Sequence, residues 1–301
     1  MIYDMLIIGS GPAGMTSAIY GLRANLKVAL FEKNAPGGAM INTAKIENYP
    51  GYKSIDGVSL SMNMYQQVID LGVDYYSREI EKIEKDDDKF KVFSDGEIFY
   101  SKTVIIATGT KNKKLSVENE EKFSGRGISW CAICDGNFFK NKIVAVVGGG
   151  NSALEEGMYL SGLAKKVYII HRRDEFRASK RIVEEAMKKE NIEFVYNTIV
   201  TGFSGSDKLE GLILKNLTSG NETILNVDGC FEYIGQEPNS NFVKGLNITN
   251  EKGYIMVDNN FETKIKGLFA SGDIINKEFR QIATAVNDGA IAALSASRYC
   301  K

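Results

Sequence analysis

The sequence predicts an α/β protein of two three-layer domains, with the second domain inserted into the first. A glycine-rich turn between a predicted strand and a predicted helix occurs twice, at residues 9–14 and 148–153. In both copies a second strand follows the helix, and the same 23-residue step leads from the first glycine to the residue that ends this strand. Each copy therefore indicates a β-α-β unit, which builds a parallel sheet covered by helices. A length of 301 residues also suits two domains better than one.

Apolar periodicity gives the remaining elements. Short β-branched runs predict strands, and longer stretches with helical spacing predict helices. Strands are expected over residues 2–8, 26–31, 143–147 and 166–170, with further short strands within 75–99. Residues 103–109 are expected to form a buried strand that ends in a tight turn, and residues 267–273 a strand followed by a turn. The helices are expected over residues 13–22, 152–161 and 280–298.

Two polar stretches mark the expected domain boundaries. Charged residues surround Lys113, and a Pro-, Asn- and Ser-rich run leads to Asn241. We therefore expect residues 1–113 and 242–301 to form the first domain and residues 114–241 to form the second. Both domains are expected to have the Rossmann-like architecture that binds dinucleotides.

The composition excludes some classes of function. Basic and acidic residues number 37 and 38, a net charge of −1, whereas a nucleic-acid-binding protein normally carries a basic excess. The apolar runs are strand-sized, and the first residues do not resemble a secretory leader, so we expect a cytoplasmic protein with no membrane segment. Four cysteines in a reducing compartment do not predict a disulfide framework.

The two glycine-rich turns are candidate dinucleotide sites. Glycines let the backbone approach a pyrophosphate, and the following helix presents free N–H groups and a partial positive charge. A tight turn without a ligand is the alternative for either copy. The candidate residues are Gly9, Gly11, Pro12, Ala13 and Gly14 in the first copy, and Gly148, Gly150, Asn151 and Ser152 in the second.

The residue that ends the second strand of each copy indicates which dinucleotide that site suits. Glu32 can accept hydrogen bonds from ribose hydroxyls and would repel a 2′-phosphate, so the first site suits FAD or NAD. The second site has Arg172, Arg173 and Arg177, whose guanidinium groups suit the 2′-phosphate of NADPH. A solvated basic patch is the alternative. His171, the only histidine, is expected either near the ribose phosphate or as a satisfied structural residue.

A Cys-x-x-Cys pair is the candidate redox centre. Cys131 and Cys134 can close a small disulfide, and the adjacent Asp135 can shuttle protons during thiol-disulfide exchange. One pair supplies too few ligands for zinc, so no metal site is expected. Cys230 is expected in the core, and Cys300 is expected to be exposed without a role.

Together these segments resemble the low-molecular-weight bacterial thioredoxin reductases, which belong to the FAD- and NADPH-dependent pyridine nucleotide-disulfide oxidoreductases. The resemblance covers nearly the whole chain in order. The matching segments are residues 9–14, 47–51, 107–109, 131–135, 148–153, 171–177, 272–273 and 280–281.

The resemblance implies a role for further residues. An FAD site would be lined by residues from several segments: Glu32, Gly37, Gly38, Asn48, Thr108, Gly109, Gly272, Asp273, Arg280, Gln281 and Ile282. Asp273 would hold the ribityl chain, and Gln281 with Ile282 would lie at the pyrimidine edge of the flavin. Cys134 would face the flavin, Cys131 would attack the disulfide of thioredoxin, and Asp135 would act as the acid/base. The resemblance also implies a rotating inserted domain and a homodimer.

Two positions depart from the family pattern, and several rival functions remain. Ala39 stands where the family often has Gln, and Trp130 stands where it often has a smaller residue. The same electron path could serve a different disulfide, and a non-catalytic redox-sensing flavoprotein is a further alternative. A related ferredoxin–NADP reductase would need no Cys pair, and a ferredoxin-fed thioredoxin reductase would need no NADPH site.

Overall fold

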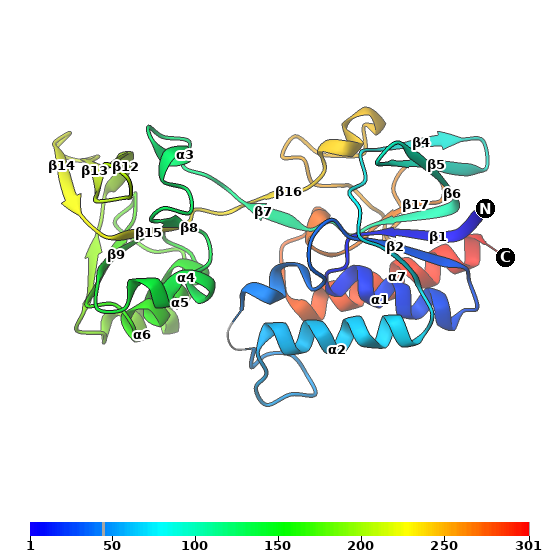
Figure 1. The fold of residues 1–301 in the computed structure, drawn as a ribbon, viewed down its shortest axis with the longest axis horizontal. Coiled ribbons are helices and arrows are strands. Elements are labelled where there is room, and N and C mark those ends of the chain that lie inside the picture. The colour runs from blue at the N-terminus through cyan, green and yellow to red at the C-terminus, as the bar shows by residue number, and fades with distance from the viewer. Residues whose placement is uncertain (44–45, 301) are drawn as a thin grey trace. The chain divides into compact units, whose positions relative to one another are not determined.

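The chain divides into two compact units. The computed structural model describes residues 1–43 and 46–300, and for Cys134 the backbone only. Unit 1 comprises residues 1–111 and 237–301, and unit 2 comprises residues 112–236 (Figure 1). The sequence placed the boundaries two and five residues later. The chain passes between the units in β7 (Thr110–Asn112) and β16 (Gln236–Pro238), which pair as a two-stranded sheet.

The elements of unit 1 follow the predicted pattern with shifted ends. Its strands are β1 (Ile2–Ile8), β2 (Val28–Phe31), β3 (Asp74–Tyr76), β4 (Lys82–Asp86), β5 (Lys89–Ser94), β6 (Glu97–Ile106) and β17 (Leu268–Ala270). Its helices are α1 (Pro12–Arg23), α2 (Gly57–Asp70) and α7 (Ile282–Tyr299), with 3-10 turns η1 (Gly38–Asn42), η3 (Asn241–Leu246) and η4 (Gly272–Ile274). The strand expected over 103–109 is the second half of the longer β6.

Over the described residues the strands of unit 1 form one mixed sheet. Its order is β3-β2-β1-β6-β5-β4, and β17 also pairs with β6. The strands β3, β2, β1, β6 and β17 run parallel, whereas β4 and β5 form an antiparallel extension on β6. Because the carboxyl ends of the parallel strands meet at one edge, the glycine turn after β1 lies next to the ends of β2 and β6.

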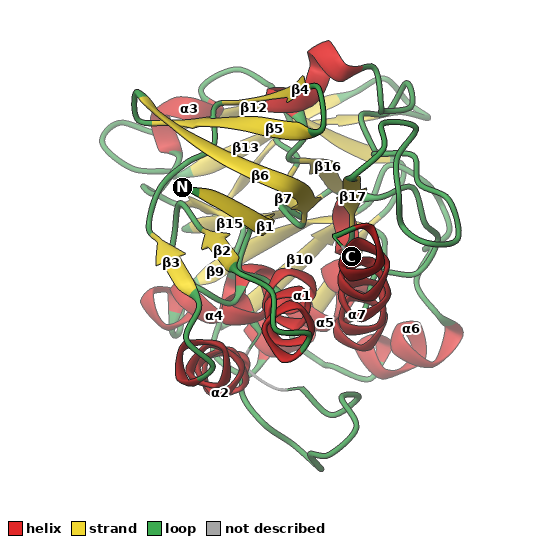
Figure 2. Ribbon diagram, turned by 90° about the vertical axis from the view of Figure 1, so that its right-hand side faces the viewer, coloured by secondary structure: helices red, strands yellow, loops and turns green. Residues whose placement is uncertain are grey.

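Alternation along the strands gives unit 1 two apolar faces. In β1, Met5 and Ile7 pack with the helices α1, α2 and α7, whereas Leu6 and Ile8 pack with residues of β4, β5 and the segment around η3. Figures 1 and 2 show the three helices together on one side of the sheet. Burial on both faces explains why the parallel strands are continuous apolar runs.

Unit 2 repeats this plan with a smaller sheet. Its strands are β8 (Ile128–Ser129), β9 (Ile143–Gly148), β10 (Lys166–Ile170), β11 (Ile192–Val195), β12 (Thr198–Ser204), β13 (Gly211–Asn216), β14 (Glu222–Asn226) and β15 (Gly229–Tyr233). Its helices are α3 (Glu120–Phe123), α4 (Ala132–Asp135), α5 (Asn151–Ser161) and α6 (Lys180–Met187), with the 3-10 turn η2 (Gly136–Phe139).

Three layers make up unit 2. The parallel sheet has the order β11-β10-β9-β15-β8, and an antiparallel sheet has the order β12-β13-β14. One apolar cluster joins the parallel sheet to α5 and α6, and a second joins its other face to β12 and β13. The predicted class, two Rossmann-like three-layer domains with one inserted into the other, is confirmed. No helix in the described part of the chain is long and apolar enough to span a membrane.

The crossing of α1 and α7 supplies the first testable prediction. Ser17 Oγ donates to the carbonyl oxygen of Gly289 at 3.0 Å, and a Cβ on Gly289 would lie 2.2 Å from the carbonyl oxygen of Ala13. Gly289→Ala is therefore expected to force the helices apart and lower the free energy of unfolding by about 1–3 kcal/mol. Thermal and urea unfolding measure this loss. Gly245→Ala is the control, since its Cβ meets no atom within 4 Å, and equal stability of the two variants would contradict the prediction.

Candidate active site

The first glycine turn leaves an open cradle at the start of α1. Gly11 is the residue before the helix, with extended backbone angles of φ −73° and ψ −177°. A Cβ on Gly11 would have only Gly38 Cα nearby, at 3.9 Å. In contrast, a Cβ on Gly14 would lie 1.8 Å from the carbonyl oxygen of Gly9, so Gly14 serves helix-turn packing. Gly11 is thus the position where backbone faces free space at a helix N-terminus, as pyrophosphate binding requires.

Glu32 follows β2 at the edge of the sheet where the first glycine turn lies. One carboxylate oxygen accepts the Ser10 N–H at 2.8 Å and the Ser10 hydroxyl at 3.1 Å, and the other accepts the Asn34 N–H at 2.9 Å. These bonds fix the orientation of the carboxylate and leave acceptor capacity for ribose hydroxyls. Ser10 holds Glu32 in place, a role that the sequence did not indicate.

Residues distant in sequence close the rest of this site. Asn48 Nδ2 donates to Gln281 Oε1 at 3.0 Å, which joins two residues that the family resemblance had placed beside the flavin. The Thr108 hydroxyl donates to the carbonyl oxygen of Asn239 at 3.0 Å, and Asn239 Nδ2 donates back to the Thr108 carbonyl at 2.9 Å. Asn239 also donates its N–H to Gly109 O. Thr108 and Gly109 therefore tie the end of β6 to residue 239, a partner that sequence reasoning missed.

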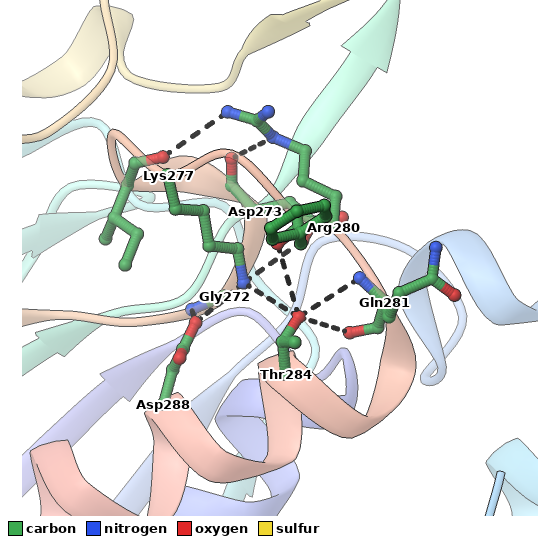
Figure 3. A network of polar contacts seen from close by, with 9 residues as sticks. Gly272, Asp273, Lys277, Arg280, Gln281, Thr284 and Asp288 are labelled. Carbon is green, nitrogen blue, oxygen red and sulfur yellow. Dashed lines mark hydrogen bonds and ion pairs between the residues drawn. The ribbon is translucent and has the colours of Figure 1, made fainter.

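A network of charged residues surrounds Asp273 (Figure 3). Lys277 Nζ lies 2.7 Å from Asp288 Oδ2 and 3.6 Å from Asp273 Oδ1. Asp288 also accepts the N–H of Gly272 at 3.2 Å, and Arg280 reaches back to the Asp273 carbonyl oxygen at 3.4 Å. These contacts order the turn between β17 and α7. The sequence gave no signal for Lys277 or Asp288, since only the turn brings them together.

Asp273 retains binding capacity inside this network. Its Oδ1 is buried and makes no hydrogen bond to any described residue. Burial raises the pKa of Asp273, whereas the charges of Lys277 and Arg280 lower it. A buried carboxylate oxygen without a hydrogen-bond donor indicates a ligand hydroxyl as its partner. Together with the open cradle at Gly11 and the ordered Glu32, it fits a flavin dinucleotide.

The second glycine turn, after β9, has the matching features for NADPH. A Cβ on Gly150 would meet no atom within 4 Å, and Gly150 immediately precedes α5. Arg177 donates its backbone N–H to Gly149 O at 2.8 Å, which places its exposed side chain next to the turn. Asn151 Oδ1 accepts the Ser179 N–H at 2.9 Å and so orders the same loop. Arg172 and Arg173 are also exposed just after β10. These donors fit a 2′-phosphate.

His171 lies under this turn rather than in the open. It is 5% exposed, and its Nε2 is 3.0 Å from the carbonyl oxygen of Glu175. Its ring stacks on Phe176, and a Cβ on Gly149 would lie 2.1 Å from the ring. Burial lowers the pKa of His171, and the neighbouring arginines lower it further. This placement favours the structural alternative that the sequence left open.

The redox motif lies at the start of α4 in unit 2. Cys131 is disulfide-bonded and half-buried, and its N–H donates to Ser129 Oγ at 3.0 Å. The next N–H, of Ala132, donates to the Tyr233 hydroxyl at 2.9 Å, and Asp135 N–H donates to Cys131 O at 3.1 Å. The side chain of Cys134 lies outside the described residues. The motif is thus held by Ser129 of β8, the strand before it, and by Tyr233 of β15.

The other two cysteines are free. Cys230 is buried in the core, as expected. Cys300, expected to be exposed, is instead half-buried, because its Sγ donates to the carbonyl oxygen of Asp4 at 3.3 Å. Among the described residues no group of three Cys, His, Asp or Glu side chains could hold a metal ion.

Half-buried acids near the redox motif were not found from the sequence. Burial, followed by the charge of Glu155, raises the pKa of Glu156 in α5 to about 7. Burial, followed by the charges of Glu156 and Asp135, raises the pKa of Tyr233. Acids that titrate near neutrality suit proton transfer to and from thiols. The adjacent Glu155 and Glu156, in a predicted helix expected to pack on the sheet, were a sequence signal for a partly buried acid.

The comparisons with known proteins agree with this arrangement. The fold and the three sets of residues define a dinucleotide-dependent disulfide oxidoreductase. The sequence pattern of the family described as pyridine nucleotide-disulphide oxidoreductase matches residues 3–289. The thioredoxin reductase of Listeria monocytogenes is 44% identical over 300 residues, 99% of this chain and 94% of the relative. The thioredoxin reductase of Bacillus subtilis is 45% identical over 300 residues, 99% of this chain and 95% of the relative.

A solved structure is also similar to this chain. The thioredoxin reductase of Lactococcus lactis superposes with a TM-score of 0.96 at 44% identity, covering 99% of both chains. The chain belongs to the pyridine nucleotide-disulphide oxidoreductase family and, within it, to the thioredoxin reductases. It is an oxidoreductase that uses FAD and NADPH.

The two open glycines supply a paired prediction. In Gly11→Ala the new methyl group occupies the open space at the first glycine turn, the expected FAD site, and in Gly150→Ala it occupies that at the second turn, the expected NADPH site. We expect Gly11→Ala to fold but purify without flavin absorbance. Gly150→Ala is expected to keep its flavin and require a higher NADPH concentration for flavin reduction. Each variant is the control of the other, and loss of flavin from Gly150→Ala alone would reverse the two assignments.

Proposed function

We propose that this thioredoxin reductase passes electrons from NADPH through FAD and a Cys131–Cys134 disulfide to the disulfide of oxidised thioredoxin. The observation that carries the proposal is the Cys131 disulfide at the start of α4, in the same chain as two open glycine turns, one beside the Glu32 carboxylate and one beside exposed arginines. When bound, NADPH supplies a hydride and FAD relays its two electrons to a disulfide.

The residues of unit 1 are proposed to bind FAD, and those of unit 2 are proposed to bind NADPH. In unit 1, Glu32 orients the adenosine ribose, Asp273 accepts from the flavin's hydroxyl chain, and Asn48 with Gln281 borders the ring. The further FAD contacts are Gly9, Gly11, Pro12, Ala13, Gly14, Gly37, Gly38, Thr108, Gly109, Gly272, Arg280 and Ile282. In unit 2, Gly148, Gly150, Asn151 and Ser152 line the NADPH pyrophosphate, Arg172, Arg173 and Arg177 bind its 2′-phosphate, and His171 supports the turn.

The thiol chemistry requires two cysteines and one acid. The Cys131 thiolate attacks the partner disulfide, so a Cys131–partner bond forms while the partner S–S bond breaks. Asp135 donates a proton to the departing thiolate. Cys134 then attacks Cys131, which restores the Cys131–Cys134 disulfide and releases the second partner thiol. Two electrons thus leave the enzyme as its dithiol becomes a disulfide.

We also propose an assembly and a cellular setting. The resemblance implies a homodimer, which sedimentation of the holoenzyme measures. Free Cys230 and Cys300 are compatible with a reducing compartment, so we propose a cytoplasmic enzyme. The rival acceptor is another disulfide on the same electron path, and it would oxidise the reduced enzyme where thioredoxin does not.

Replacement of the attacking cysteine separates the two half-reactions. Cys131→Ser is expected to lose thioredoxin reduction to background, since no thiolate remains to attack the partner. NADPH is still expected to bleach the flavin, because both cradles are intact. Stopped-flow absorbance of the flavin, followed by addition of oxidised thioredoxin, measures both steps. Sustained thioredoxin turnover by this variant would overturn the role of Cys131.

Removal of a guanidinium tests the choice of nicotinamide cofactor. Arg177→Ala loses charge-assisted bonds to the 2′-phosphate, each contributing about 1.5–3 kcal/mol, so the KM for NADPH is expected to rise on the order of tenfold to a hundredfold. The KM for NADH is expected to stay unchanged. Arg181→Ala is the matched control, because Arg181 is exposed and pairs with Glu185 in α6. An equal rise for NADPH and NADH would contradict the assignment.

A further inference from the structure

Glu232 is a fully buried acid whose side chain meets the residue before the redox cysteine. It lies in β15, between β9 and β8 of the parallel sheet, and has 0% exposure. Its Oε2 accepts the indole N–H of Trp130 at 3.1 Å, and its buried Oε1 has no hydrogen-bond donor among the described residues. Trp130 directly precedes Cys131 and is the only tryptophan of the chain. The electron path described above gives Glu232 no task.

A second acid, Glu120, faces Glu232. Glu120 is 3% exposed and accepts backbone N–H groups from Leu115, Ser116 and Val117. Three backbone donors thus satisfy the acceptor oxygens of Glu120. Two adjacent buried carboxylates repel each other, so the proton of such a pair belongs on the acid with fewer donors. Glu232 is that acid.

The electrostatics of Glu232 agree with this geometry. Burial, followed by the charge and the side chain of Glu120, raises the pKa of Glu232 to about 8. The Leu115 backbone and the Trp130 bond act in the opposite direction but are weaker than these effects. The other titratable groups that face it are Lys114, from the segment before α3, and Cys230 on its own strand. The hydrogen bond to Glu121 raises the pKa of Lys114 and burial raises that of Cys230, and the charge of Glu232 adds to both shifts.

Trp130 is anchored at more than one point. Its carbonyl oxygen accepts from Asn112 Nδ2 at 3.4 Å, and Lys114 Nζ lies 5.6 Å from its ring. The indole N–H bond to Glu232 fixes the ring as well as the backbone. Any change at Glu232 is therefore transmitted to the residue adjoining Cys131.

We propose that Glu232, as a neutral acid, is a positioning residue of the redox motif that accepts from Trp130 and donates its proton to Glu120. The inference rests on the proposed role of Cys131. It goes further by joining β15, Trp130 and the 115–120 segment into one support for the redox cysteine. Loss of the proton breaks the bond to Glu120 and replaces it with repulsion, so the support weakens as the pH rises through about 8.

Linkage sets the sign of the pH effect on stability. Between the ordinary glutamate pKa of 4.5 and about 8, the folded chain binds a proton that the unfolded chain has released. The free energy of unfolding therefore decreases as the pH rises through this window. Glu232→Gln removes this contribution, because its amide accepts from Trp130 and donates to Glu120 at every pH.

The first test observes the bond directly. In isotopically labelled holoenzyme the single indole N–H resonance of Trp130 is expected to shift with a midpoint near pH 8. The shift is expected to be absent in Glu232→Gln and unchanged in the control Glu222→Gln, which alters an exposed strand residue of the same unit. A resonance that is constant from pH 6 to about 9, or that still titrates in Glu232→Gln, would overturn the proposal.

The second test measures function with thioredoxin and, separately, with a small aromatic disulfide. The reduction rate of the unsubstituted enzyme is expected to fall severalfold as the pH rises through about 8, and the fall is expected to vanish in Glu232→Gln. Glu232→Leu is expected to be severalfold slower at all pH values, with NADPH still bleaching the flavin. Parallel pH profiles for the enzyme and Glu232→Gln would exclude the positioning role.

The two tests distinguish failure of the Glu232 role from failure of thioredoxin as the acceptor. The resonance is recorded without any acceptor, so failure of thioredoxin as the partner leaves its result intact. The aromatic disulfide reports the redox pair whichever protein is the acceptor. Glu232→Gln preserves the shape of the core, so the conclusion does not depend on whether Glu232→Leu folds.

Discussion

Parallel strand pairing is the constraint on which both candidate nucleotide sites depend. In unit 1, β1 pairs with β2 on one side and β6 on the other, all in one direction. This pairing brings the glycine turn after β1, the Glu32 carboxylate after β2 and the Thr108 turn after β6 to one edge. In unit 2, β9 pairs in the same way with β10 and β15. Each site is a consequence of three strand ends meeting.

The strand ends place the candidate sites, and buried polar groups near them add positions that need a ligand or a proton as a partner. Asp273 has a buried oxygen without a hydrogen bond to the described residues, and Lys277 with Asp288 orders the turn that holds it. Buried and half-buried acids also adjoin the redox motif, where burial raises the pKa of Glu156 and Glu232. Such arrangements destabilise a fold unless a ligand or a proton satisfies them. Their presence next to the three candidate sites is therefore consistent with binding and proton transfer.

The boundary between the units shows where local sequence reasoning is limited. Composition placed the second crossing after Asn241, since Pro and Asn are common in linkers. The structure ends unit 2 at Gln236, because Asn239 exchanges hydrogen bonds with Thr108 and so belongs to unit 1. A linker residue is one that makes no contacts with a domain. Whether residue 239 makes such contacts depends on Thr108, which lies more than a hundred residues away in sequence.

The sequence by itself determined the fold class, the two glycine turns, Glu32 and the arginines that follow β10, and the Cys-x-x-Cys pair. These features are local, because strand periodicity, turn glycines and strand-end residues are read within about thirty positions. Only the tertiary structure decided that His171 is buried under Gly149, that Asn48 bonds Gln281, and that Lys277 pairs with Asp288. It alone brought Glu232 to Trp130, because burial and the charge of a neighbour depend on packing between segments far apart in the chain.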